Sequence, residues 1–236
     1  MVIPLDDDNP TTTRPYATAG ILIACVLVYA WQHLLLSAIG AQQAVIDFGM
    51  VPATVAGGEL LPSGALIPPW ATIFTSMFVH LGFWHLAGNL LFLWIFGNNV
   101  EEAMGHLRFL IFYVTCGIVA AFSQVLPNPG SIIPIVGASG AISGVLGAYM
   151  LLFPRARVLL GLPLGFLNLE FGRFPAIWVL ATWFALQLLF VAIAAARTVG
   201  ESQGGIAFGA HIAGFIAGCA LVTIFKRRHV PLWRRY

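Results

Sequence analysis

Long apolar segments separated by short polar ones dominate this chain of 236 residues. A helix of about 20 apolar residues is long enough to cross the hydrocarbon core of a bilayer. We therefore predict an all-α fold, a polytopic membrane helix bundle that forms a single membrane domain over residues 1–236. The pattern predicts six transmembrane helices, over residues 17–38, 77–98, 108–126, 139–153, 175–196 and 206–225.

Two other stretches are partly apolar but do not form a clean span. The connection after the first segment runs for roughly 40 residues, contains Pro68 and Pro69, and is expected at the membrane interface. Residues 158–174 are interrupted by polar and helix-breaking residues such as Pro163 and Glu170. We interpret them as an interfacial loop, because a seventh span would disrupt the topology.

Composition agrees with an integral multi-pass membrane protein. Hydrophobic residues make up 59% of the chain and charged residues 8%, against roughly 25% charged in soluble domains. The three cysteines fall in apolar segments, which favours packing residues over a disulfide framework. Residues 1–16 carry three consecutive aspartates and no basic region, so they resemble neither a signal peptide nor a transit peptide.

Positive charge is concentrated on one side of the predicted bundle. Of the eleven Lys and Arg residues, only Arg197 falls on the opposite side. The positive-inside rule then places both termini in the cytoplasm, in a protein of the cell (inner) membrane. Residues 1–16 become a short cytoplasmic segment and residues 226–236 a basic cytoplasmic tail.

Ser139 and His211 are polar residues in apolar segments at one predicted depth. Fourteen steps separate Ser139 from Phe153 and His211 from Phe225, and basic residues follow both segments. At 1.5 Å per residue, both side chains lie roughly 21 Å above the basic side. In a hydrocarbon core about 30 Å thick, this is roughly 9 Å below the opposite surface. A serine and a histidine at one depth indicate a nucleophile and its base.

The segment 139–153 is too short to cross the membrane alone, at about 22 Å. Residues 131–138 before it are apolar but broken by proline and glycine, so we expect extended chain beside a water-filled cavity. Ser139 would then start its helix, where free N–H groups can stabilise an oxyanion. An N-cap serine in a packing motif is the structural alternative. Glycines around Ser139 and His211 permit the two helices to approach closely.

His85 and Asn89 are four residues apart and share a helix face at depths that bracket the serine. They could donate hydrogen bonds to an oxyanion, or they could form a polar bond between helices. His80 is expected near the surface in a structural role. The segment 85–89 lacks the glutamate and second histidine of a zinc-protease motif, so no metal site and no cofactor are expected. The predicted spans contain no carboxylate, so the imidazole must be oriented by another group.

Three motifs in this order resemble the rhomboid family of intramembrane serine proteases. They are Gly137-Ala138-Ser139-Gly140, the pattern Ala210-His211-xx-Gly214-xxx-Gly218, and the set His80, His85 and Asn89. The resemblance implies a Ser139–His211 dyad, with His85, Asn89 and the Ser139 N–H in the oxyanion hole. It also implies substrates that are other membrane proteins in the lipid bilayer, cut near or within a transmembrane segment, and no nucleic-acid partner.

One position departs from the family pattern. Some members carry an aromatic residue one turn after the nucleophile, stacked on the catalytic histidine, and here that position is Ser143. Two other functions compete with that of an intramembrane serine endopeptidase. A non-catalytic relative that binds membrane clients would be expected to lack the serine or the histidine. A transporter would more often show inverted repeats and buried charges.

Overall fold

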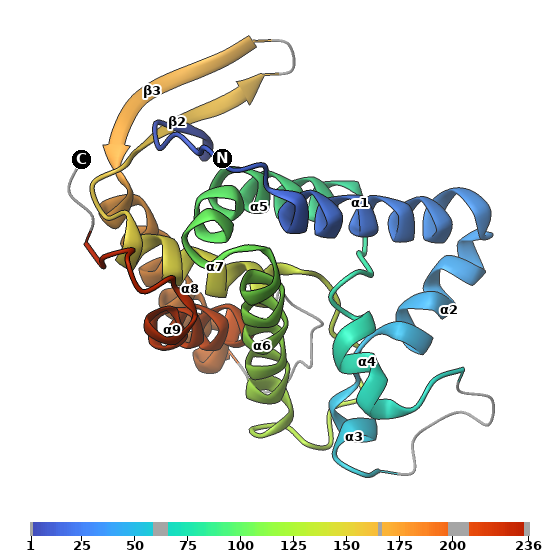
Figure 1. Cartoon of the computed structure of the whole chain (residues 1–236). Helices are drawn as coiled ribbons and strands as arrows, with labels where there is room; N and C mark the ends of the chain where they lie inside the picture. The colour runs from blue at the N-terminus through green and yellow to red at the C-terminus, as the bar shows by residue number, and fades with distance from the viewer. Residues whose placement is uncertain (1, 59–65, 165–166, 198–207, 234–236) are drawn as a thin grey trace.

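The computed structural model describes residues 2–58, 66–164, 167–197 and 208–233 (Figure 1). These residues form a bundle of helices with a small sheet at one end. The helices are α1 (Tyr16–Ala30), α2 (Ala38–Phe48), α3 (Pro52–Val55), α4 (Pro69–Thr75), α5 (Phe83–Met104), α6 (His106–Val125), α7 (Ser139–Leu152), α8 (Ala176–Arg197) and α9 (Phe208–Phe225). A π-helical turn, Trp31–Leu35, continues α1.

Four helical segments are long and apolar enough to cross a membrane, within the residues that the structure describes. They are Tyr16–Leu35, His106–Val125, Ala176–Ile193 and Phe208–Phe225. Together with the composition, they make the chain an integral membrane protein. The other two predicted spans correspond to α5, which carries asparagines and glutamates, and to α7, which has 14 residues. The count of six therefore stays a prediction.

The second predicted span, 77–98, has the wrong boundaries. Residues 77–82 form turns and bends, and α5 begins only at Phe83 and continues to Met104. Gly82 has extended backbone, which separates the helix from the preceding turn. Hydropathy favoured the apolar residues before Gly82 and undervalued the polar end of the helix, whose Asn99 and Glu101 are buried.

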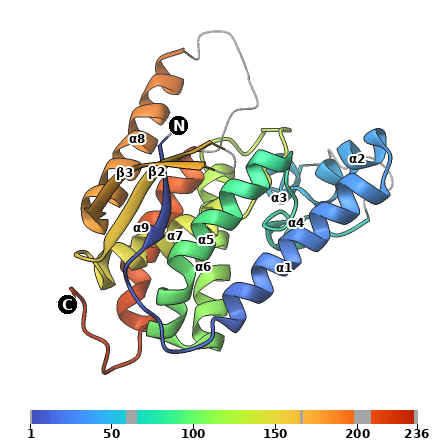
Figure 2. The ribbon, with the colours of Figure 1, turned by 90° about the horizontal axis from the view of Figure 1, so that it is seen from above.

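The all-α prediction is wrong in one region, because residues 158–174 are not a loop. Strands β1 (Ile3–Asp7), β2 (Arg157–Leu164) and β3 (Leu167–Pro175) form an antiparallel sheet in the order β1-β2-β3. Apolar and polar residues alternate in β3 from Leu167 to Phe171, which is the period of a strand. The sheet extends from one end of the helix bundle and includes the N-terminal segment (Figures 1 and 2).

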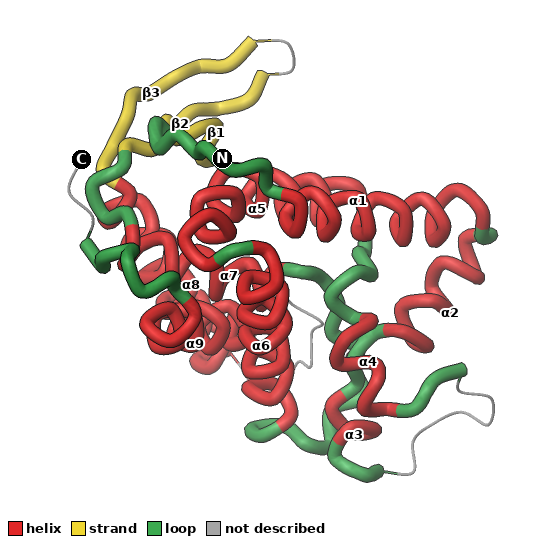
Figure 3. Tube along the Cα trace, viewed as in Figure 1, coloured by secondary structure: helices red, strands yellow, loops and turns green. Residues whose placement is uncertain are grey.

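Helix α7 lies inside the bundle, against α5, α6 and α9, whereas α2, α3 and α4 lie to one side (Figure 3). Residues 141–149 of α7 are all buried. The predicted close approach of glycine-rich helices is confirmed. A Cβ atom on Gly214 would clash with the carbonyl oxygen of Gly140, and one on Gly218 with that of Gly144. The backbones of α7 and α9 therefore touch directly.

Candidate active site

Ser139 and His211 meet in the structure although 72 residues separate them. Ser139 is the first residue of α7, and Ala138 occupies the N-cap position, so Ser139 is not itself the cap. The Ser139 Oγ lies 2.8 Å from Nε2 of His211, which projects from the first turn of α9. This is hydrogen-bond distance, as a nucleophile and its base require.

The chain before Ser139 is extended and anchored on both sides. The backbones of Met50 and Ile135 exchange two hydrogen bonds, of 2.9 and 2.8 Å. Gly137 donates its N–H to the carbonyl oxygen of Ser76 at 2.8 Å. Its φ of +113° is a backbone conformation in which a residue with a side chain would be strained. These contacts fix the position of the chain just before Ser139, the first residue of α7.

His85 and Asn89 of α5 lie next to this glycine. A Cβ atom on Gly137 would be 2.7 Å from Nε2 of His85 and 3.9 Å from Nδ2 of Asn89. The Asn89 Nδ2 already donates to the carbonyl oxygen of His85 at 2.8 Å, which leaves one amide hydrogen. The structure therefore brings both predicted donors to the chain two residues before Ser139.

His80 is fully buried inside the protein. Its expected depth near the membrane surface stays a prediction. Its Nδ1 lies 3.0 Å from the carbonyl oxygen of Phe78, and its ring meets that of His85 edge to face at 5.2 Å. Packing of the turn before α5 explains the burial. His80 thus packs edge to face against the ring of His85.

Ser143 uses its hydroxyl within its own helix. It donates to the carbonyl oxygen of Ser139 at 2.6 Å. Aromatic neighbours of His211 come instead from α8 and α9, where the rings of Trp183 and Phe208 lie 6.0 and 6.3 Å from the imidazole.

Gln187 of α8 is the residue that sequence reasoning missed. Its Oε1 lies 2.9 Å from Nδ1 of His211, and its side chain is buried. The available signal was an amide in the middle of an otherwise apolar span, where a polar group needs a partner. Its partner could not be identified from the sequence, because it lies on another helix.

A family model described as Rhomboid domain matches residues 68–228, which include Ser139, His211, His85 and Asn89. The chain belongs to the rhomboid family.

Curated relatives agree with this family. The rhomboid chain is 40% identical to "Rhomboid protein 1, mitochondrial" of Saccharomyces cerevisiae over 93 residues, which are 38% of this chain and 27% of that protein. It is 41% identical to "Rhomboid protease GluP" of Bacillus subtilis over 81 residues, which are 34% of this chain and 15% of that protein. With "Rhomboid-like protein 11, chloroplastic" of Arabidopsis thaliana, 27% identity extends over 165 residues, or 68% of this chain and 54% of that protein. The rhomboid chain thus spans only part of the length of each.

The described part of the rhomboid chain contains no group of three or more His, Cys, Asp or Glu residues able to hold a metal ion. The polar side chains near Ser139 are His211, which contacts its Oγ, and His85 and Asn89, which lie beside Gly137, while the Gln187 amide contacts His211. This set can move a proton and can donate hydrogen bonds to an oxygen atom.

Proposed function

We propose that this rhomboid is an intramembrane serine endopeptidase in which Ser139 and His211 form a catalytic dyad. The observation that carries the proposal is the distance of 2.8 Å between Ser139 Oγ and His211 Nε2. The presence of both residues favours an enzyme over a non-catalytic relative. The substrates would be other membrane proteins of the bilayer, cut near or within a transmembrane segment.

The geometry supports a two-step acyl transfer. Ser139 Oγ bonds to the carbonyl carbon of the scissile peptide while its proton passes to His211 Nε2. The imidazolium then returns this proton to the leaving amide nitrogen, and the peptide bond breaks. Water then attacks the acyl carbon while Nε2 takes its proton. The ester bond to Oγ breaks, Nε2 returns the proton to Ser139 Oγ, and the new C-terminal carboxylic acid leaves.

The oxyanion would be stabilised by the Ser139 N–H at the start of α7 and by His85 and Asn89. The N-terminus of a helix of 14 residues supplies unpaired N–H groups and the positive end of the dipole. The side chains of His85 and Asn89 beside Gly137 support this arrangement. Donors held in this way by the fold would need little reorganisation during the reaction.

The charge distribution supports a cell (inner) membrane location with both termini cytoplasmic, so that residues 1–16 and 226–236 lie in the cytoplasm. The site then opens toward the opposite side of the membrane. Named relatives include mitochondrial and chloroplastic proteins.

The dyad is tested with Ser139→Ala and His211→Ala in detergent and in proteoliposomes. We expect each variant to lose at least about 10³-fold of the cleavage of a transmembrane substrate, because the two residues act as a unit. Ser139→Ala should also lose labelling by a fluorophosphonate probe. Ser37→Ala is the control, because this serine caps α2 by accepting from the Gly40 N–H and lies in a different helix pair from the dyad. Full activity of a folded Ser139→Ala protein would contradict the proposal.

A further inference from the structure

Among the residues that the structure describes, each ring nitrogen of His211 has one polar partner. Nε2 faces Ser139 Oγ at 2.8 Å, and Nδ1 faces Gln187 Oε1 at 2.9 Å. Nε2 can take the proton of Ser139 only if it carries the lone pair, so the neutral ring must hold its proton on Nδ1. An amide oxygen is an acceptor only, and it therefore selects this tautomer.

A second contact determines which way the Gln187 amide points. Its Nε2 donates to the carbonyl oxygen of Trp183, one turn earlier in α8, at 3.5 Å. In the flipped orientation, Oε1 would face that carbonyl oxygen, and the NH₂ group would face the imidazole Nδ1. Both contacts would then be unfavourable for the required tautomer. Because Gln187 is only 7% exposed, water has little access to replace either bond.

We infer that Gln187 is the positioning residue that holds His211 in its base-competent tautomer and orientation. The inference rests on the proposed function and deepens it. It assigns to a neutral amide of α8 the role that a carboxylate has in a Ser-His-Asp triad. It also makes the alignment of the base depend on α8, a helix that carries none of the other proposed catalytic groups.

The neighbouring rings agree with this role. Trp183, whose carbonyl orients the amide, has its indole 6.0 Å from the imidazole at an interplanar angle of 34°. Phe184 stacks on Phe215 of α9 at 4.6 Å and 24°, which holds α8 against α9 next to Gln187. The packing of α8 on α9 therefore holds the Gln187 amide next to His211.

The test compares Gln187→Met with Gln187→Glu in single-turnover cleavage. Methionine keeps the length of the side chain and removes the acceptor. We expect kcat to fall about 10–100-fold with little change in KM, as for groups that orient metal-bound imidazoles. Glutamate restores an acceptor and should recover most of the lost rate. Gln43→Met is the control for the substitution itself, because Gln43 lies on α2 and donates to Asp47 of the same helix.

A second readout does not depend on catalysis. The ¹⁵N chemical shifts of the His211 ring, assigned with His211→Gln, should show a protonated Nδ1 in the native protein and a mixture of tautomers in Gln187→Met. Native kcat and an unchanged tautomer in folded Gln187→Met, with Ser139→Ala inactive, would overturn the role of Gln187 and leave the dyad standing. Full activity of Ser139→Ala would overturn both.

Discussion

Gly214 of α9 lies directly against the main-chain carbonyl oxygen of Gly140 in α7. No side chain fits between these backbones, and the contact is one residue from Ser139 in the chain and three from His211. The close approach of the two helices, and with it the distance between nucleophile and base, therefore depends on the absence of a side chain at Gly214.

Gly214→Ala should separate the helices and abolish cleavage. Its Cβ would meet a backbone oxygen that cannot rotate away, and overpacking of this kind typically costs about 1–3 kcal/mol. We expect a lower melting temperature together with loss of fluorophosphonate labelling, because Ser139 and His211 move apart. Gly20→Ala is the control, since a Cβ at this position of α1 meets nothing within 4 Å. This control should be neutral or more stable by up to about 1 kcal/mol, and native labelling by Gly214→Ala would contradict the argument.

His85→Ala and Asn89→Ala should lower kcat more than they raise KM. Loss of one oxyanion donor typically costs about 10²–10³ in kcat. The effect of Asn89 should be smaller, about tenfold, because its amide already donates to the carbonyl oxygen of His85. Melting temperature and single-turnover rate are measured on the same preparations. An unchanged rate with a clear loss of stability would assign both residues to helix packing alone.

Asp7 should make the attachment of β1 sensitive to pH. The Tyr149 hydroxyl donates to its carboxylate, and burial raises the pKa of Asp7 from 3.8 to about 6, with a further increase from the charges of Asp6 and Asp8. The folded protein then binds more protons than the unfolded chain between these values. The free energy of unfolding should therefore fall as pH rises from about 4 to about 6 and stay lower above that.

Hydrogen exchange of residues 3–7 and thermal unfolding between pH 4 and 8 check this dependence. Asp7→Asn should flatten it, because the amide cannot titrate. Asp47→Asn, which changes an aspartate of α2 that accepts from Gln43, should keep the native profile. Equal flattening in both variants would show that Asp7 is not the group responsible.

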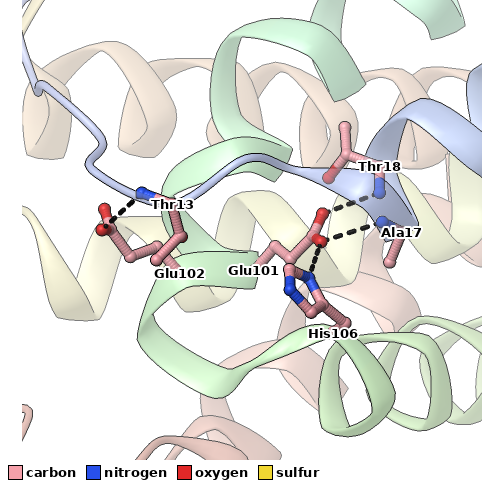
Figure 4. Close-up of polar contacts among 6 residues, drawn as sticks. All are labelled: Thr13, Ala17, Thr18, Glu101, Glu102 and His106. Atoms are coloured by element: carbon pink, nitrogen blue, oxygen red, sulfur yellow. Dashed lines mark hydrogen bonds and ion pairs between the residues drawn. The ribbon is translucent and has the colours of Figure 1, made fainter.

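Glu101→Gln should destabilise the docking of α1 on α5. The buried carboxylate of Glu101 accepts from the N–H groups of Ala17 and Thr18, at 2.8 and 2.7 Å, and contacts His106 Nδ1 (Figure 4). An amide replaces one acceptor oxygen with a donor that faces other donors. We expect a loss of about 1–3 kcal/mol in the free energy of unfolding.

Glu102→Gln is the matched control for this prediction. Glu102 accepts from the N–H groups of Thr12 and Thr13, but these contacts are exposed or only partly buried. Exposed polar contacts contribute little, so we expect a change below about 1 kcal/mol. If both variants melt like the native protein in detergent, the buried carboxylate does not anchor α1.

The sequence by itself determined the apolar helices and the candidate dyad. The predicted spans 108–126, 139–153 and 175–196 match α6, α7 and α8 within two residues. The span 206–225 ends with α9 at Phe225, and its first two residues lie outside the described part of the chain. These boundaries are local, because each follows from where an apolar run meets polar or glycine-rich chain. The common depth of Ser139 and His211 also follows from counting residues along two such runs.

Only the tertiary structure decided the groups around the dyad and the sheet at the end of the bundle. Strand β1 pairs with β2, more than 150 residues later in the chain, so neither strand was evident from its own segment. Gln187 was visible as an amide in a span, but its contact with His211 arises from how α8 packs on α9. A hydropathy profile reports only how apolar each segment of the chain is. Contacts between helices depend on rotation and close approach, which only the packed fold sets.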